Sequence, residues 1–180
     1  MSMREAALLT AALLAGACAT RPVTPALPGL GTPLAAADVA AYDISIPPSG
    51  AGLPAGGGDA RDGAKVYQAK CANCHGAKAA GKPADALAGG IGSLKTATPQ
   101  RTVGSYWPHA TTLFDYTRRA MPVDKPLSLS SDEVYAVTAY VLFVNGIVAE
   151  DARMDAQTLP RVRMPNRDGF IDASRGEPAR

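Results

Sequence analysis

The feature that most constrains this chain is the contiguous sequence Cys71-Ala72-Asn73-Cys74-His75. The pattern Cys-x-x-Cys-His is the attachment signal of a c-type haem. Two thiols three positions apart can bond the two vinyl groups of one porphyrin, and the adjacent imidazole is then placed under the iron. The sequence therefore predicts one covalent haem c, bound by Cys71 and Cys74, with His75 as an axial ligand of its iron.

Two other chemistries use paired cysteines, and both fit this chain less well. A structural zinc site needs four ligands, and outside the motif the chain offers only Cys18 and His109. A thioredoxin-like motif follows a strand in a βαβ unit, whereas residues 65–70, which lead into Cys71, have a helical pattern. We therefore favour haem attachment.

The length and charge of the chain limit its role. At 180 residues it has room for one compact domain with extensions, and too little for a redox enzyme with its own substrate domain. We therefore expect no catalytic residues. The 18 basic and 16 acidic residues give a formal net charge of +2, which does not suggest nucleic acid or a polyanionic substrate as a partner.

Residues 1–17 have the pattern of a signal peptide, because an apolar run too short to span a bilayer follows Arg4. The run ends at Cys18 in a sequence that resembles the lipobox of bacterial lipoproteins, with Ala15 where leucine is usual. We predict export to the periplasm and acylation of Cys18, which would anchor the protein to a membrane surface. Cleavage at an Ala-x-Ala site without acylation is the alternative.

The rest of the chain divides by composition. Residues 18–40 are rich in Pro, Gly and Ala and predict a tether that resists helix formation. Residues 41–58 predict an extended segment, because apolar and polar residues alternate from Tyr42 to Ile46. We place the haem domain at residues 59–147 and a C-terminal extension at residues 148–180.

Two helices are expected at the ends of the haem domain. Asp59 is the predicted N-cap of a helix that ends near Ala72, with Gly63 on a face that another helix can approach closely. Ser130 and Glu133 have the spacing of a capping box, and an apolar stripe from Val134 to Val144 follows them. Asn145 and Gly146 then end this last helix.

A shorter helix is expected between these two, from Thr112 to Ala120, and it must end before Pro122. No internal repeat is visible, and the pattern requires no sheet. A first helix that bears the motif, a short middle helix, a loop methionine and a last helix that crosses the first together resemble the small monohaem cytochrome c fold. The predicted class is all-α, with an extended N-terminal tether and a C-terminal tail.

The sixth ligand of the iron decides the chemistry, because a strong ligand closes the iron to substrates. Met121 is our choice, since Ala120-Met121-Pro122 lies in a loop ahead of the last helix and the proline fixes the backbone there. A thioether ligand stabilises Fe(II) and raises the reduction potential, as an electron acceptor requires. The alternative for Met121 is a methionine that fills space in the core.

Three other side chains are weaker candidates for the sixth ligand. Met164 also precedes a proline but lies beyond the last helix, and Met154 stands between Arg153 and Asp155 and is expected to be exposed. His109 would give bis-histidine ligation and a lower potential, although such a histidine is more often a surface residue.

Arg101, Tyr106 and Trp107 are candidates to bind the haem propionates, because their side chains donate hydrogen bonds to an anion. Packing in the core is an equally good explanation of Trp107.

Several runs resemble a narrower family, the cytochrome c subunits of bacterial molybdenum-containing sulfite or sulfane dehydrogenases in sulfur oxidation. The runs are Tyr42 to Ile44, Gly52 to Pro54, Thr102 to Pro108, Ala110 to Tyr116, Arg118 to Pro122, Asp132 to Tyr140 and Met164 to Phe170. The resemblance covers roughly residues 40 to 170. It implies that electrons from a molybdenum cofactor on a partner chain, reduced as sulfite is oxidised, pass to this haem and on to another cytochrome or an oxidase.

Other functions stay open at this stage. A generic periplasmic cytochrome c that serves a terminal oxidase needs the same haem and ligands. A peroxidase-type enzyme needs an open or displaceable sixth ligand. A haem sensor or a structural haem would exchange no electrons rapidly with a dehydrogenase.

Overall fold

The computed structural model describes residues 31–171, which form parts of two units, residues 1–40 and 41–180. The predicted signal peptide and Cys18 lie outside the described residues. A helix, α2 (Ala36–Tyr42), runs from the first unit into the start of the second. The prediction that this stretch resists helix was wrong, because residues 35–41 contain neither proline nor glycine and are mostly alanine, the strongest helix former.

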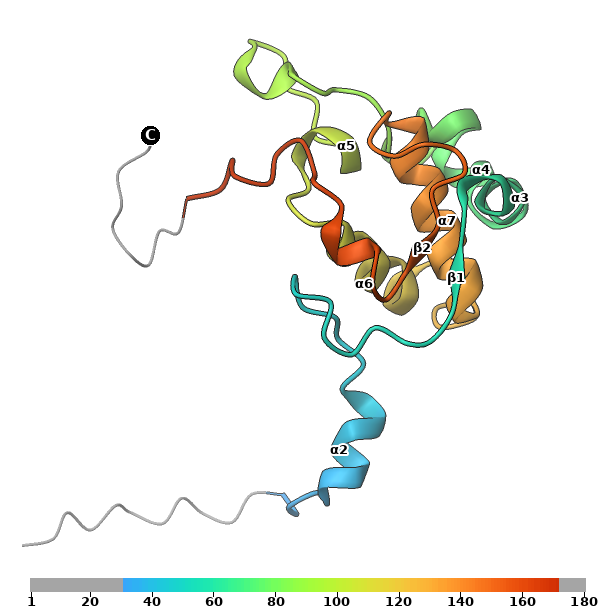
Figure 1. Ribbon diagram of the computed structural model, residues 1–180, viewed down its shortest axis with the longest axis vertical. Helices are drawn as coiled ribbons and strands as arrows, with labels where there is room; N and C mark the ends of the chain where they lie inside the picture. Colours follow the sequence, from blue (N-terminus) through green and yellow to red (C-terminus); the bar gives the residue numbers. More distant parts are fainter. Residues whose placement is uncertain (1–30, 172–180) are drawn as a thin grey trace, which may run out of the picture. The chain divides into compact units, whose positions relative to one another are not determined.

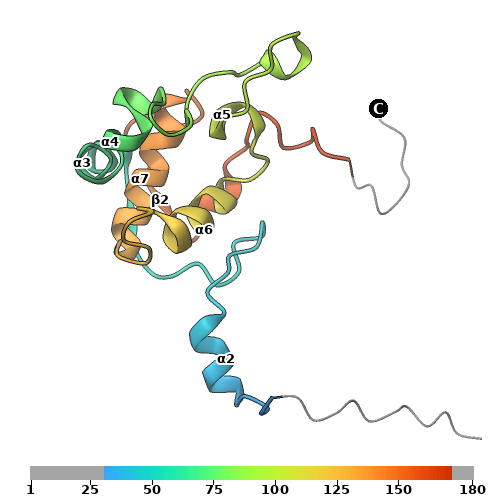
Figure 2. The same cartoon turned by 180° about the vertical axis from the view of Figure 1, so that it is seen from behind.

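The second unit is mainly helical, which confirms the predicted fold class. Its helices are α3 (Ala60–Lys70), α4 (Ala72–His75), α5 (Val103–Tyr106), α6 (Ala110–Ala120) and α7 (Ser131–Val144), with single 3₁₀ turns at Ala77–Ala79, Ser93–Lys95 and Leu159–Arg161. In both views α7 lies between α3 and α4 on one side and α5 and α6 on the other (Figures 1 and 2). The last helix is therefore the centre of the fold.

The crossing of α3 and α7 depends on Gly63, as the sequence predicted. A Cβ at this position would overlap the backbone carbonyl of Ala136 and lie 2.8 Å from the Cβ of Tyr140. The absent side chain lets the two backbones come into direct contact. Tyr67, one turn later on α3, is buried and packs its ring against Tyr140, with the ring centroids 4.9 Å apart.

A pair of two-residue strands, which the sequence did not predict, joins distant parts of the unit. Strand β1 (Gly57–Gly58) pairs antiparallel with β2 (Met154–Asp155) alongside α7. A Cβ at Gly58 would lie 2.6 Å from the Cβ of Ala136, so only glycine fits between the ladder and the helix. This pairing turns Met154 into the core, where it is 4% exposed, and the prediction of an exposed Met154 was wrong.

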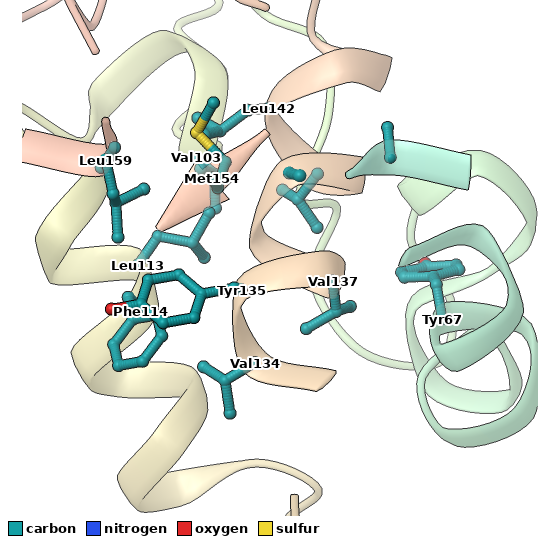
Figure 3. Packing of buried hydrophobic residues seen from close by; sticks show 14 of the residues in the cluster. Tyr67, Val103, Leu113, Phe114, Val134, Tyr135, Val137, Leu142, Met154 and Leu159 are labelled. Atoms are coloured by element: carbon teal, nitrogen blue, oxygen red, sulfur yellow. The ribbon is translucent and has the colours of Figure 1, made fainter. Parts of the chain in front are cut away.

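The hydrophobic core lies on both sides of α7. Tyr135 points toward Phe114 of α6 on one side, with ring centroids 4.5 Å apart, and Val137 lies on the other side, which faces Tyr67 of α3 (Figure 3). Leu159 and Met164 are also buried, so residues beyond 147 contribute to the same core. Of the helices within residues 31–171, none combines the length and the apolar composition that crossing a bilayer requires.

The predicted capping signals are confirmed. Asp59 caps α3 by accepting hydrogen bonds from the N–H groups of Arg61 and Asp62, at 2.9 and 3.0 Å. Ser130 and Glu133 form the capping box of α7. Glu133 also accepts a hydrogen bond from Lys70 of α3 at 2.8 Å, so one carboxylate both caps α7 and joins it to α3.

We expect Glu133→Ala to lower the free energy of unfolding at pH 7 by about 1 kcal/mol, because the Ser130 N–H and the Lys70 ammonium lose their hydrogen-bond acceptor. The hydrogen bond from Lys70, and then that from the Ser130 N–H, hold the pKa of Glu133 below its ordinary value of 4.5. Because the pKa is lower in the folded state, the ionised carboxylate stabilises the folded protein fully at pH values above the ordinary pKa. This stabilisation is lost as the pH falls through the folded-state pKa.

Urea unfolding of the holoprotein at pH 7 and pH 3 tests this expectation, and the effect of Glu133→Ala should shrink at the lower pH. Asp62→Ala is the control, because Asp62 forms an exposed pair with Lys65 and should change stability little. If Glu133→Ala lowers the free energy of unfolding as much at pH 3 as at pH 7, the charge of the Glu133 carboxylate is not the source of its stabilising effect.

Candidate functional site

An apolar cavity of about 290 Å³ lies within the second unit. The end of α3 and α4 line it with Tyr67, Cys71, Cys74 and His75. From the other elements come Leu113 and Thr117 of α6, Met121 and Pro122 after it, and Val137 and Val141 of α7. The folded chain thus brings the predicted haem motif and the predicted sixth ligand to one cavity.

The cysteines lie where two helices meet. α3 ends at Lys70, Cys71 follows as its C-cap, and α4 begins at Ala72. Both thiols are free, with Cys71 half-buried and Cys74 exposed. Burial raises the pKa of the Cys71 thiol to about 11, against a smaller opposite effect of Lys70. Both thiols line the same cavity, and neither has a disulfide partner among the described residues.

The imidazole of His75 is oriented by a backbone group. Its Nδ1 lies 2.8 Å from the carbonyl oxygen of Asp85. A carbonyl oxygen only accepts, so Nδ1 carries the proton and Nε2 keeps a lone pair that can bind a metal. Tyr67 supports the same segment, because its hydroxyl donates to the carbonyl of Gly76 at 2.8 Å. Burial raises the pKa of Tyr67 to about 12, so it stays a donor at neutral pH.

Met121 is the C-cap of α6, and its N–H donates to the carbonyl of Thr117 at 3.1 Å. It is the one candidate sixth ligand among the four that lines the cavity. Met154 and Met164 are buried in the core, and His109 is the N-cap of α6. Geometry therefore favours the choice made from the sequence, while ligation itself stays a prediction.

Neither alternative chemistry for the cysteines agrees with this arrangement. The Cys-x-x-Cys segment runs from the C-cap of α3 into α4, and it follows a helix and not a strand. Within residues 31–171, no group of three or more His, Cys, Asp or Glu side chains could hold a bare metal ion. The geometry thus disfavours both a thioredoxin-like site and a structural zinc site.

Comparisons with known proteins agree with this interpretation. Residues 58–141 match the family model described as cytochrome C oxidase, cbb3-type, subunit III. The chain is also similar to a chain in the crystal structure of the sulfane dehydrogenase SoxCD from Paracoccus pantotrophus, with 39% identity and a TM-score of 0.76. That match covers 83% of this chain and 74% of the other. The protein belongs to the sulfur-oxidation cytochrome c family. None of the curated proteins matches it.

Membership of this cytochrome c family implies a c-type haem with iron, and the residues of the cavity fit that group. The site offers free thiols at Cys71 and Cys74 and a histidine whose Nε2 is available. When bound, haem supplies a one-electron Fe(II)/Fe(III) couple. The apolar side chains of Leu113, Val137 and Val141 would help to exclude water from the haem, and the low dielectric that results would disfavour the extra charge of the ferric form.

The predicted propionate ligands do not line this cavity. The guanidinium of Arg101 lies over the ring of Tyr106, 5.3 Å from its centroid, and Tyr106 packs against Phe170. Trp107 packs edge-on against Tyr116, at 5.7 Å between ring centroids. The Asn166 side chain donates to the carbonyl of Tyr106 at 2.7 Å, so the C-terminal segment holds this aromatic group. Binding of propionates by these residues stays a prediction.

Sequence reasoning missed several residues of the cavity wall. Leu113, Thr117 and Met121 are spaced by four residues, as are Val137 and Val141. On a helix, such spacing places side chains on one face. The signal was available in the sequence, because counting back from Met121 by four identifies the α6 residues beside it.

Proposed function

We propose that this protein receives electrons from a molybdenum-containing sulfite or sulfane dehydrogenase and passes them to another cytochrome. The observation that carries the proposal is the similarity to sulfane dehydrogenase SoxCD, at 39% identity over 83% of the chain. The site supports it, because the motif and a methionine share one apolar cavity. The molybdenum and the substrate would be bound by the partner chain.

In this proposal each residue has a definite task. Cys71 and Cys74 form thioether bonds to one haem, and His75 binds the iron through Nε2. The Met121 thioether is the sixth ligand, which keeps the iron closed to peroxide and favours Fe(II). Both side chains would hold the iron in either oxidation state, so that little rearrangement would accompany electron transfer.

The place of action is also part of the proposal. We infer export to the periplasm through residues 1–17 and a lipid anchor on Cys18, followed by a tether. An anchored carrier of this kind meets its partner by diffusion near a membrane surface. Its interfaces with donor and acceptor should be small and short-lived, as electron-transfer interfaces usually are.

Stopped-flow reduction tests the proposed donor. The ferric holoprotein is mixed with a bacterial molybdenum sulfane or sulfite dehydrogenase subunit and its substrate, and the reduced haem bands are recorded. We expect reduction on the millisecond-to-second scale, and none when substrate is omitted. An unrelated monohaem cytochrome c serves as a control for non-specific transfer. Absence of reduction, or equal rates for both cytochromes, would argue against this partner.

A second candidate function rests on the match of residues 58–141 to the cytochrome C oxidase, cbb3-type, subunit III model. It is a periplasmic carrier that delivers electrons to a terminal oxidase. Rapid oxidation of the reduced protein by an oxidase, together with no reduction by the dehydrogenase, would favour this function over the first.

A further inference from the structure

Three side chains of α6 bind residues 44–48, a segment that is distant in the sequence. The hydroxyl of Thr111 donates to the carbonyl of Pro48, and Arg118 donates to the carbonyl of Ile44, both at 3.2 Å. Between them, Asp115 accepts a hydrogen bond from the N–H of Ile46 at 2.8 Å. Residues 44–48 are therefore attached along the length of α6.

Asp115 is the charged centre of these contacts. It is 8% exposed, and its carboxylate also accepts hydrogen bonds from Nε and Nη2 of Arg119, one turn later. Burial raises the pKa of Asp115, but the hydrogen bonds from Arg119 and Ile46 lower it by more, so the net shift is downward. A buried carboxylate with these partners is ionised at neutral pH, and removing it leaves the Ile46 N–H and Arg119 without their acceptor.

The two faces of α6 have different tasks. Leu113, Thr117 and Met121 follow each other at intervals of four and line the haem cavity. At 100° per residue, Asp115 and Arg119 lie about 160° and 200° around the helix axis from the centre of this row. They are therefore on the opposite face, which binds residues 44–48. A helix held on one face cannot rotate or slide without moving the residues on the other.

We propose that Asp115 is a positioning residue for Met121: it holds α6 against residues 44–48 and so keeps the Met121 sulfur in place as the sixth ligand. This inference rests on the proposed ligation by Met121. Arg118 donates to the carbonyl of Ile44 and Arg119 donates to Asp115, so both side chains help to hold α6 in the same place.

The expected consequence is a weaker bond between Met121 and the iron when Asp115 is replaced. In ferric Asp115→Ala, exogenous imidazole should displace Met121 more easily, with its affinity raised by about tenfold or more. The methionine-to-iron charge-transfer band should weaken, and the midpoint potential should fall because the thioether stabilises Fe(II). Asp115→Asn keeps an oxygen acceptor for Ile46 but loses the charge, so its effect should be smaller.

Asp155→Asn is the matched control. Asp155 also accepts hydrogen bonds from backbone N–H groups, those of Gln157 and Thr158 at 2.8 and 2.9 Å, but it does not line the cavity. A general loss of stability, measured by urea unfolding, should appear in Asp155→Asn as well as in the Asp115 variants. A change in imidazole affinity and potential should appear only at Asp115.

Met121→Ala separates failure of this inference from failure of the proposed ligation. If Met121→Ala keeps the charge-transfer band, Met121 is not the ligand and the proposed function must be revised. If the band disappears, while Asp115→Ala binds imidazole within about twofold of the unaltered protein, ligation stands and the positioning role is wrong. If Asp115→Ala does not accumulate as holoprotein, the imidazole affinity of Asp115→Asn is measured in its place. An imidazole affinity unchanged from that of the unaltered protein would equally overturn the inference.

Discussion

Replacing both Cys71 and Cys74 by alanine is expected to abolish covalent attachment of haem. Both thiols are free and face the cavity beside His75. Each single variant should retain haem through one thioether, because the remaining thiol can still bond one vinyl group. The pyridine haemochrome spectrum of a single variant should therefore shift to longer wavelength, as one vinyl group stays unsaturated.

Acid-acetone extraction and mass spectrometry of the intact chain measure the effect. Haem should remain with the unaltered protein and with the single variants, and it should be extracted from the double variant. Cys18→Ala is the control, because Cys18 has no part in the predicted haem site and its loss should leave attachment unchanged. Acid-stable haem on the double variant would show that the site has been wrongly assigned.

Gly63→Ala is expected to destabilise the protein by about 2 to 3 kcal/mol. At an ordinary helix position the same change is stabilising by about 1 kcal/mol, because alanine is the better helix former. Here the new Cβ would overlap the carbonyl of Ala136, which is backbone and cannot turn aside. The contact between α3 and α7 must widen, and the cavity between these helices widens with it.

Denaturant unfolding of the holoproteins measures this effect. Gln68→Ala is the control, because Gln68 lies on an exposed position of the same helix and its replacement should change stability by less than about 0.5 kcal/mol. A Gly63→Ala variant as stable as the unaltered protein would mean that the two helices do not cross closely at this residue.

The successful sequence predictions share a property, which is that their signals are local. Asp59 caps a helix through residues two and three positions away, and Ser130 pairs with Glu133 within one turn. The Cys-x-x-Cys-His motif is contiguous. Hydrogen bonds and covalent geometry over so few residues depend little on the rest of the fold.

The wrong or incomplete predictions depended on distant partners. Met154 looked exposed between two charged residues, but β2 pairs with Gly57 and Gly58 almost one hundred positions earlier and turns its side chain inward. Tyr106 packs against Phe170 and accepts a hydrogen bond from Asn166, and Arg101 lies over its ring, so neither lines the cavity and their binding of propionates stays a prediction. For Met154 a contact across the chain outweighed the local pattern.

The sequence by itself determined the helical class, the capped ends of the main helices and the nature of the group that the motif binds, because these follow from interactions within a few residues. Only the tertiary structure decided which methionine shares the cavity with His75 and what holds it there. The contact between Asp115 and Ile46, to which we assign the positioning of Met121, joins residues 69 positions apart. Burial of apolar surface brings such residues together, and it is a property of the whole fold and not of any one segment.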